Sequence, residues 1–479
     1  MLNFAMNHRS RTYLLSLILA VSSSTAYAAD LSIEGPLDRP LDLIDAWHAA
    51  QSKDPTFGAA RAGAEAGKKK NDQAKALNLP QVNASAGTGV VNAYNKISNA
   101  QFSAPGFGSV DGAAFKTQTD HGVDLRWNIS AEQPLYNAER SSMAHQLNKQ
   151  AQLAGVKFSA EEQQLILRVS KAYFDVLLAE DTLASIKRQR VAVAQALVVA
   201  KGRFSEGDVA IIDTHEAQAR DDALVSQELE ADSIYQLAHA VLVDLTGNSD
   251  GFLAHLPEQT NFQQFNAGEL NEWLTLAQSN SLYLHMQQIQ QGIAHDEIDK
   301  YSSSNAPILN LVAQAGGEEL HGIGGGANSA LSNHALSVGV QLTIPLFTGG
   351  MRNAKYEEAV ALEEQAKDES EAMRLKAGQQ VRTSWLGVTV GKGKVKAIEQ
   401  ALHSSKVKLD ATELGREVGD RTTLDVLNAE QEYHSTRTEL FRARYQMLLS
   451  YLGLAATAGV LDEKRLMEVN AVLVTKRSE

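Results

Sequence analysis

The chain has 479 residues and is acidic, because 57 aspartates and glutamates outnumber 44 lysines and arginines and leave a formal net charge of −13. Such a balance argues against nucleic acid as a partner. The sequence contains no cysteine. This excludes disulfides, thiolate metal sites, cysteine nucleophiles and the cysteine-linked lipid anchor of bacterial envelope proteins.

The first 28 residues are typical of a secretory signal peptide. Arg9 and Arg11 precede a short apolar core at 13–20, and Ala26 and Ala28 are the small residues that a signal peptidase needs. The apolar run is too short for a membrane helix, and no later stretch reaches the roughly 20 apolar residues required. Removing residues 1–28 changes the formal charge to −15 (−13 minus 2). We therefore expect an exported protein of a Gram-negative envelope.

The rest of the chain contains a duplication with an offset of about 212 residues (385 minus 173). Several anchors keep their order at nearly this offset: residues 168–173 align with 380–385, 204–208 with 416–420, Asp213 with Asp425, and Ala217 with Ala429. We predict a first repeat at 29–250, a second repeat at 251–460, and a loosely ordered periplasmic tail at 461–479.

Both repeats have the same predicted plan: a helical stretch, two strands around a Gly- and Ser-rich loop, a very long helix and a shorter helix. In the first repeat the last four elements are strands at about 81–94 and 121–134 and helices at about 137–205 and 208–247. In the second repeat they are strands at about 307–316 and 334–346 and helices at about 350–415 and 420–453.

The strand predictions depend on alternation of apolar and polar residues, which is clear in the second strand of each repeat and weaker in the first. Val123, Leu125, Trp127 and Ile129 alternate with polar residues, and the stretch 336–344 does the same. These segments have about the 9–11 residues that a tilted strand needs to cross a bilayer. A soluble, half-buried sheet is the alternative. Four strands between such long helices argue against it.

The long helices have the spacing of coiled coils. From Leu165 to Leu197, positions spaced alternately by four and three residues are all apolar apart from Arg190. This spacing corresponds to a period of 3.5 residues. A helix over 137–205 would extend roughly 100 Å. The second repeat has a weaker seam from Leu427 to Leu452, interrupted by Gln431, His434 and Thr438, which predicts a helix with a wet face.

Four membrane strands cannot close a barrel, because the smallest outer-membrane barrels have about eight. Open sheet edges do not occur in lipid, since unpaired backbone groups are costly there. The chain is therefore predicted to be a mixed α and β membrane protein that oligomerises to close its sheet. Two copies would supply eight strands and three would supply twelve, and arithmetic does not choose between them.

Three stretches carry a family resemblance. They are 418–431 with its first-repeat partner 206–213, then 442–449, and then 344–350. On these residues the sequence resembles the TolC-like outer-membrane factor family over essentially the whole mature chain. The resemblance implies a homotrimer with a twelve-strand barrel in outer-membrane lipid, continuous with a long helical barrel in the periplasm. It also implies a periplasmic adaptor protein and an inner-membrane ABC transporter or proton-driven pump as partners, and no cofactor.

The same resemblance implies a periplasmic gate where the helices turn. Gly207 and Gly419 suit the left-handed conformation that ends a helix, and Asp208 and Asp420 follow them. Asp213 lies six residues after Gly207. An acid near a helix N-terminus is also favoured by the helix dipole alone, by about 0.3–1 kcal/mol.

In the second repeat, Asp425 and Arg421 match the charged gate network of the family, and Asp213 matches the first-repeat acid. Two positions depart from the pattern: Arg416 stands where a gate tyrosine is expected, and Asn428 where a second aspartate is expected. We therefore hypothesise a gate held by Arg416 and Arg421 pairing with Asp213, Asp425 or Glu417. Three Asp425 side chains near one axis predict a cation-selective, cation-blockable constriction.

Other function classes explain less. The run 322–326 superficially resembles a phosphate loop but lacks the following Lys-Ser/Thr, and we predict a flexible extracellular loop there. No HExxH or GxSxG motif is present, so we expect no enzyme. A structural trimeric coiled-coil surface protein would not explain the four strands. Drug-efflux members of the family that the sequence resembles are often lipidated on a cysteine, which this chain lacks. The resemblance therefore implies the outer-membrane component of a type I secretion system, with a multidrug or small-molecule efflux pump as the alternative.

Overall fold

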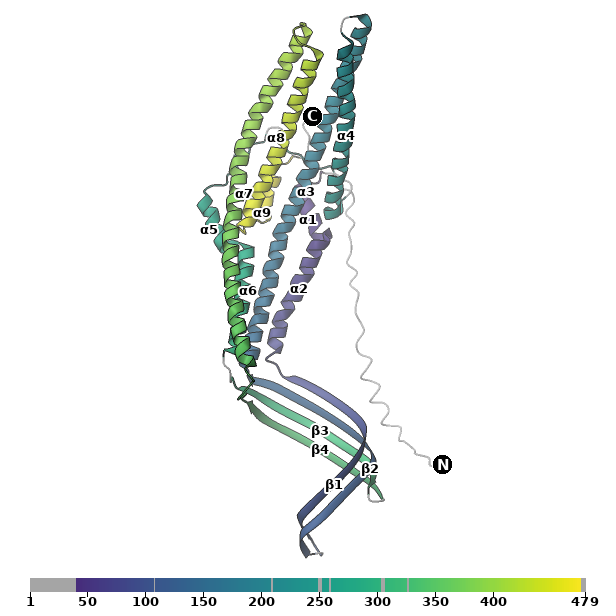
Figure 1. Cartoon of the computed structure of the whole chain (residues 1–479), viewed down its shortest axis with the longest axis vertical. Helices are drawn as coiled ribbons and strands as arrows, with labels where there is room; N and C mark the ends of the chain where they lie inside the picture. The colour runs from purple at the N-terminus through teal and green to yellow at the C-terminus, as the bar shows by residue number, and fades with distance from the viewer. Residues whose placement is uncertain are drawn as a thin grey trace, which may run out of the picture.

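The computed structural model describes residues 40–106, 108–207, 210–248, 252–257, 260–302, 306–324 and 327–474. The molecule is a long rod with helices at one end and a twisted sheet at the other (Figure 1). In chain order the elements are α1 (Leu43–Lys53), α2 (Pro55–Ala76), β1 (Gln81–Ala104), β2 (Gly108–Tyr136), α3 (Ala138–Glu206), α4 (Ile211–Thr246), α5 (Leu270–Asn280), α6 (Leu282–Tyr301), β3 (Ile308–Gly324), β4 (Ala327–Thr343), α7 (Met351–Glu417), α8 (Thr423–Thr457) and α9 (Glu463–Asn470).

Two very long helices set the length of the rod. Helices α3 and α7 have 69 and 67 residues, so each extends about 100 Å. Each turns back at the end farthest from the sheet, α3 into α4 and α7 into α8 (Figure 1). We call these two turns the tips. Within the described ranges, no helix has both the length and the apolar character needed to cross a membrane.

The predicted coiled-coil seam of α3 is confirmed by burial. Its buried members are Leu165, Val169, Ala172, Val176, Ala179, Leu183, Val193 and Leu197. Arg190 interrupts the apolar series, and its Nη1 lies 2.8 Å from Oε2 of Glu228 on α4. The arginine is therefore tolerated in the seam because its head group reaches a carboxylate on the neighbouring helix.

The prediction of a wet face on α8 is wrong at His434. Gln431 is exposed, but His434 is 9% exposed and lies between α8 and α3. Its Nδ1 lies 3.2 Å from Ser185 Oγ of α3, and its Nε2 lies 3.9 Å from Glu430 Oε1. A polar residue interrupts the apolar spacing here because a serine on the facing helix supplies a hydrogen-bond partner.

The His434 contact predicts an acid-sensitive seam between α3 and α8. Burial, followed by the charges of Arg188, Arg437 and Lys406, lowers the pKa of His434 from 6.5 to about 4. Between pH 6.5 and 4, His434 binds a proton in the unfolded chain but stays neutral in the folded chain, so the free energy of unfolding decreases as the pH falls. The loss is up to about 3 kcal/mol. We expect His434→Gln to flatten the pH dependence of thermal unfolding between pH 6.5 and 4. A variant whose melting temperature falls in parallel with that of the parent would contradict this.

The sheet contains four antiparallel strands in the order β1-β2-β3-β4. Its strands are longer than predicted, with 24 residues in β1 and 29 in β2 instead of about 14 each. The Gly- and Ser-rich segments expected as loops are themselves paired, and residues 322–324 of the predicted loop belong to β3. Residues 325 and 326 lie outside the described residues. Backbone pairing in such a hairpin does not need apolar alternation.

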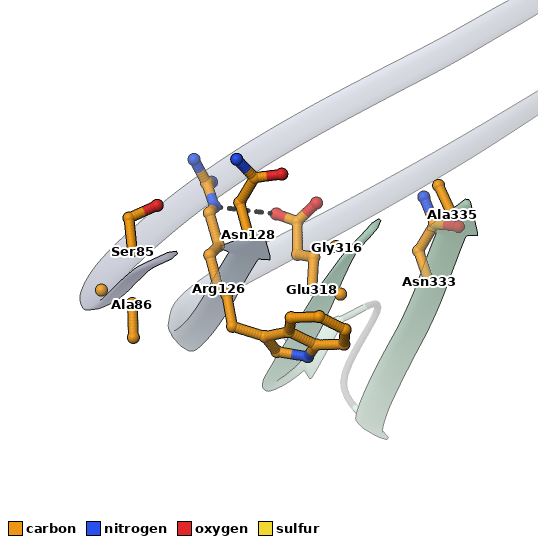
Figure 2. A pocket seen from close by; sticks show the side chains of 11 residues that line it. Ser85, Ala86, Arg126, Asn128, Gly316, Glu318, Asn333 and Ala335 are labelled. Atoms are coloured by element: carbon orange, nitrogen blue, oxygen red, sulfur yellow. Dashed lines mark ion pairs between the residues drawn. The ribbon is translucent and has the colours of Figure 1, made fainter. Parts of the chain in front are cut away.

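The two faces of the sheet differ in polarity. On one face Val123, Leu125, Trp127 and Ile129 remain 40–54% exposed. The other face carries polar side chains, of which Ser85, Arg126, Asn128 and Glu318 appear in Figure 2. Arg126 Nε lies 2.8 Å from Asp124 Oδ2 and 3.2 Å from Glu318 Oε1, which joins β2 to β3 across this face. A large exposed apolar face on one side is what lipid or a protein partner would cover.

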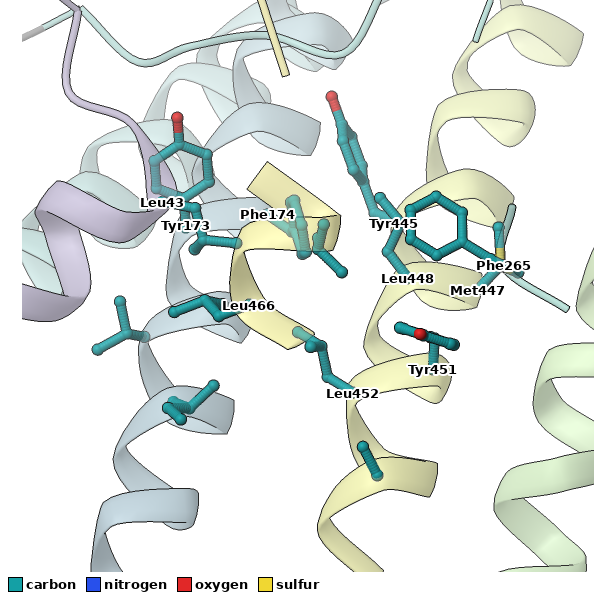
Figure 3. Close-up of a cluster of buried hydrophobic side chains, with 14 of the residues drawn as sticks. Leu43, Tyr173, Phe174, Phe265, Tyr445, Met447, Leu448, Tyr451, Leu452 and Leu466 are labelled. Carbon is teal, nitrogen blue, oxygen red and sulfur yellow. The ribbon is translucent and has the colours of Figure 1, made fainter. Parts of the chain in front are cut away.

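The main core lies midway along the rod, where α1, α3, α8 and α9 meet (Figure 3). The ring of Phe174 stacks on Tyr445 at 5.3 Å between centroids. The Tyr173 hydroxyl lies 2.9 Å from the carbonyl oxygens of both Leu41 and Ala254, so it can donate to either. This links the chain before α1 and the segment after α4 to the long helix.

The prediction of a loosely ordered tail is wrong. Residues 463–470 form α9, which is capped by Asp462 accepting from the Arg465 N–H at 3.0 Å. Leu466 and Val469 are completely buried in the main core. The pattern was missed because only two apolar residues, spaced by three, carry the burial. Residues 475–479 lie outside the described residues.

Candidate functional site

The α7–α8 tip is a compact turn closed by its own backbone and caps. Gly419 has φ +83, the left-handed conformation predicted for it. The N–H groups of Asp420 and Arg421 both donate to the Gly415 carbonyl, at 2.8 and 3.1 Å. Thr422 and Asp425 then form a reciprocal capping box at the start of α8. Several of the backbone groups left free at the two helix ends are thereby satisfied.

Asp425 is first of all a capping residue. Its Oδ2 accepts from both the N–H and the hydroxyl of Thr422, each at 2.9 Å. The hydrogen bond from the Thr422 backbone, then that from its hydroxyl, and the charge of Arg421 hold the pKa of Asp425 below its usual value. The carboxylate is therefore ionised at neutral pH and is partly exposed at the end of the rod.

Arg421 lies against the end of α7. A Cβ added at Gly415 would come within 2.7 Å of Arg421 Cγ, so the glycine makes room for the arginine side chain. Arg416, Glu417 and Asp420 are exposed around the same turn. Within the described part of a single chain, no ion pair joins Arg416 or Arg421 to Asp213, Asp425 or Glu417. One copy alone therefore does not make the hypothesised pairs.

The α3–α4 tip is built differently. Helix α3 ends at Glu206, and Gly207 has φ +81, again as predicted. Asp208 lies outside the described residues. Helix α4 starts without a side-chain cap, and Asp213 in its first turn is exposed, with its backbone N–H bonded to the Ala210 carbonyl at 3.2 Å. The Asp213 carboxylate is therefore not engaged by a cap, unlike that of Asp425.

One residue that the sequence analysis missed joins the two helical hairpins near the tips. Arg220 of α4 donates from Nη1 to Asn428 Oδ1 of α8 at 3.3 Å and also contacts the side-chain oxygen of Gln431. Arg220 follows Asp213 by seven residues, which is two helical turns, so both lie on one face of α4. This seven-residue spacing from Asp213 is the feature of the sequence that could have identified Arg220. Asn428 is thus held by a cation instead of adding a second acid.

Comparison with known proteins identifies the family. The family model described as outer membrane efflux protein matches residues 46–248 and 273–460. This chain belongs to the outer membrane efflux protein family. Two curated relatives are similar over most of their length. One is outer membrane protein TolC of Vibrio cholerae, 34% identical over 356 residues, covering 73% of this chain and 80% of the relative. The other is alkaline protease secretion protein AprF of Pseudomonas aeruginosa, 28% identical over 443 residues, covering 91% and 88%.

Solved structures share the fold of this family member. The CmeC outer membrane channel of Campylobacter jejuni superposes with a TM-score of 0.71 at 14% identity, covering 90% of this chain and 89% of that one. The outer membrane protein VceC of Vibrio cholerae gives 0.69 at 15% identity, covering 87% and 96%. The expected mixed α and β fold and the resemblance to TolC are confirmed, and the chain is an outer-membrane protein with a periplasmic portion.

Proposed function

We propose that three copies of this chain form a tunnel that carries exported substrates across the periplasm and the outer membrane. The observation that carries the proposal is the open sheet. Within the described residues, β1 and β4 each have one unpaired edge, beside a face that exposes large apolar side chains. Unpaired edges are not tolerated in lipid, so β4 of one copy must pair with β1 of the next. The family resemblance favours three copies, which give twelve strands.

The helices support the same ring. Within one chain α3 contacts α8, so α4 and α7 lie at the two outer sides of the helical layer. Both carry exposed apolar residues, including Ile234 and Leu237 on α4 and Leu386 and Val390 on α7, each more than half exposed. An apolar groove between α3 and α4 is lined by Leu178, Ala179, Ile234, Leu237 and Val241 among others. We propose that α7 of the next copy covers this groove.

We propose that the tunnel is the outer-membrane component of a type I secretion system, with a periplasmic adaptor and an inner-membrane ABC transporter as partners. Relatives named as secretion proteins support this, since AprF and the proteases secretion protein PrtF of Dickeya chrysanthemi match over 91% and 97% of this chain. The outer membrane efflux protein BepC of Brucella suis matches over 72%. A multidrug efflux pump with a proton-driven transporter is the alternative.

A complementation experiment separates these two roles. The chain is expressed in cells that lack their own outer-membrane component but keep an ABC secretion transporter, its adaptor and a drug pump. We expect the substrate of the ABC transporter, a secreted protease, to appear in the culture medium. Restored drug resistance with no secreted protease would assign the chain to efflux instead.

We also propose that the tips form the periplasmic gate. The residues concerned are Asp213, Arg416, Arg421, Asp425 and Asn428, with Gly207, Gly419 and Asp420 at the turns. The proposal also includes Asp208, which lies outside the described residues. In support, Asp213, Arg416 and Arg421 are exposed and Asp425 is partly exposed, and the tips lie at the free end of the rod (Figure 1). Among the described residues of one copy, neither Arg416 nor Arg421 forms an ion pair with Asp213, Asp425 or Glu417, so we propose that these pairs form between neighbouring copies.

Arg220 predicts a second, weaker restraint on the gate. Replacing it by alanine removes the bonds from α4 to Asn428 and Gln431, so α7 and α8 can swing away from α3 and α4. A partly exposed bond to a charged group is worth about 1 kcal/mol, which predicts about fivefold more time in conducting states. Lys201→Ala is the control, because Lys201 bonds Gln218 within the α3–α4 hairpin. Planar-bilayer recordings in which both variants behave alike would contradict this role.

A further inference from the structure

The sheet is uneven, because one hairpin extends well beyond the other. Strands β1 and β2 stay paired from Gln81 and Glu132 out to Ala104 and Gly108. Pairing of β2 with β3 stops at Asp120 and Ile323. Residues 93–106 and 108–119 therefore form a two-stranded hairpin beside which the described residues place no further strand, and we call it the outer hairpin. Its 12 residues from Ala93 to Ala104 extend about 40 Å.

The outer hairpin begins outside the apolar band of the sheet. Trp127, Gly317 and His334 share one row across the strands, and Trp at such a position is typical of the membrane interface. In the next row outward on the same face, Leu125 lies beside Glu319, which in turn lies beside Ser332. The helices leave the sheet at its other end (Figure 1). The outer hairpin therefore lies on the extracellular side.

A hinge separates the outer hairpin from the rest of the sheet. Between Asp120 and Val123 of β2, two residues oppose the single residue Gly322 of β3, which is a β-bulge. His121 has φ +52, and its N–H donates to the Asn92 side-chain oxygen at 2.6 Å, where the pairing of β1 also skips a residue. Bulges bend strands, and Figure 1 shows the hairpin turning sharply at this level.

The direction of the bend follows from two glycines. A Cβ added at Gly122 would lie 2.9 Å from Leu320 Cδ1, and one added at Gly322 would lie 2.4 Å from Thr119 Cγ2. Glu318, Leu320 and Gly322 are spaced by two along β3, so they share one face of the sheet. This is the polar face, because Glu318 contacts Arg126 there. Thr119 of the outer hairpin therefore rests on the polar face of the sheet, in space that only glycine leaves free.

We propose that the outer hairpin of each copy folds across the extracellular mouth of the barrel and limits the size of the solutes that pass it. This inference rests on the proposed tunnel, in which the polar face of the sheet lines the lumen. The hairpin has apolar groups to pack at such a constriction. Tyr94, Ile97 and Val110 are more than half exposed, and the rings of Phe102 and Phe115 lie 5.6 Å apart.

The test uses the absence of cysteine in the chain. A reporter, Asn128→Cys, is placed on the polar face below the hinge, where Figure 2 shows Asn128 beside Arg126. Intact cells are exposed from outside to a small, membrane-impermeant maleimide and to a bulky polyethylene-glycol maleimide. The reporter is combined with deletion of residues 93–119, with Gly322→Ala, or with Gly339→Ala. The last is the control, because a Cβ at Gly339 meets nothing within 4 Å.

We expect the small reagent to label the reporter in every variant. The bulky reagent should label the deletion variant but scarcely the parent. Gly322→Ala displaces Thr119 by overpacking, which predicts labelling by the bulky reagent about tenfold faster than in Gly339→Ala. Equal labelling of parent, Gly322→Ala and deletion by the bulky reagent would overturn the outer constriction. If even the small reagent failed in all of them, the failure would lie with the proposed tunnel, since Asn128 would not face an aqueous lumen.

Discussion

Neutralising Asp425 should abolish the preference of the channel for cations and its block by multivalent cations. In the proposed trimer, three ionised carboxylates near one axis would attract cations, and the lowered pKa of Asp425 keeps this carboxylate ionised at neutral pH. Asp425→Asn removes the charge but retains an oxygen that can accept the Thr422 N–H. Asp425→Ala removes the charge together with the acceptor of the bonds from Thr422, so it should also lower stability, although the Thr422 hydroxyl can still cap the N–H of residue 425. Ion selectivity is measured from reversal potentials in asymmetric salt.

The two Asp425 variants together separate the charge from the cap. Both should lose selectivity to the same extent, whereas only Asp425→Ala should lower the melting temperature. The control is Asp410→Asn, because Asp410 is already paired with Lys406 at 2.7 Å within α7. Selectivity and block that persist in Asp425→Asn would remove this residue from the gate and leave it as a cap.

Replacing Arg421 should open the periplasmic end. If Arg421 pairs with an acid of the next copy, the closed ring has three such links, each worth about 0.5–1 kcal/mol at an exposed site. Loss of all three in Arg421→Ser predicts a shift of about 1.5–3 kcal/mol, so conduction should rise about tenfold or more. The same cells should become sensitive to large antibiotics that the closed tunnel excludes.

A matched variant tests whether the loss of any basic side chain from this helical hairpin raises the conductance. Lys408→Ser removes a basic residue from the same helical hairpin, but Lys408 pairs with Glu432 inside the α7–α8 pair, at 2.5 Å. We expect its conductance to equal that of the parent. An unchanged conductance in Arg421→Ser, or an equal rise in both variants, would mean that the tips are not held by links between copies.

The parts of the fold that could be predicted are those in which side chains follow the backbone period. The α3 seam from Leu165 to Leu197 keeps a period of 3.5, and the strand from Val123 to Ile129 keeps a period of two, so burial and exposure follow directly. The left-handed turns at Gly207 and Gly419 were also predictable, because glycine adopts φ above zero without strain.

The parts that escaped prediction depend on partners distant in sequence or on the backbone alone. His434 is buried because Ser185, 249 positions earlier, faces it. Arg220 meets Asn428 across 208 positions. The outer hairpin is held by backbone pairing, which does not require apolar and polar residues to alternate along the sequence. Helix α9 has only Leu466 and Val469 to fill the core, too few residues for a periodic signal.

The number of chains in the assembled protein tests the central proposal most directly. Native mass spectrometry of the detergent-solubilised, processed protein counts the copies without assuming their arrangement. The proposed twelve-strand tunnel, with α4 of one copy against α7 of the next, predicts a mass of three chains. A stable monomer or a dimer would contradict the twelve-strand tunnel and the gate that depends on it.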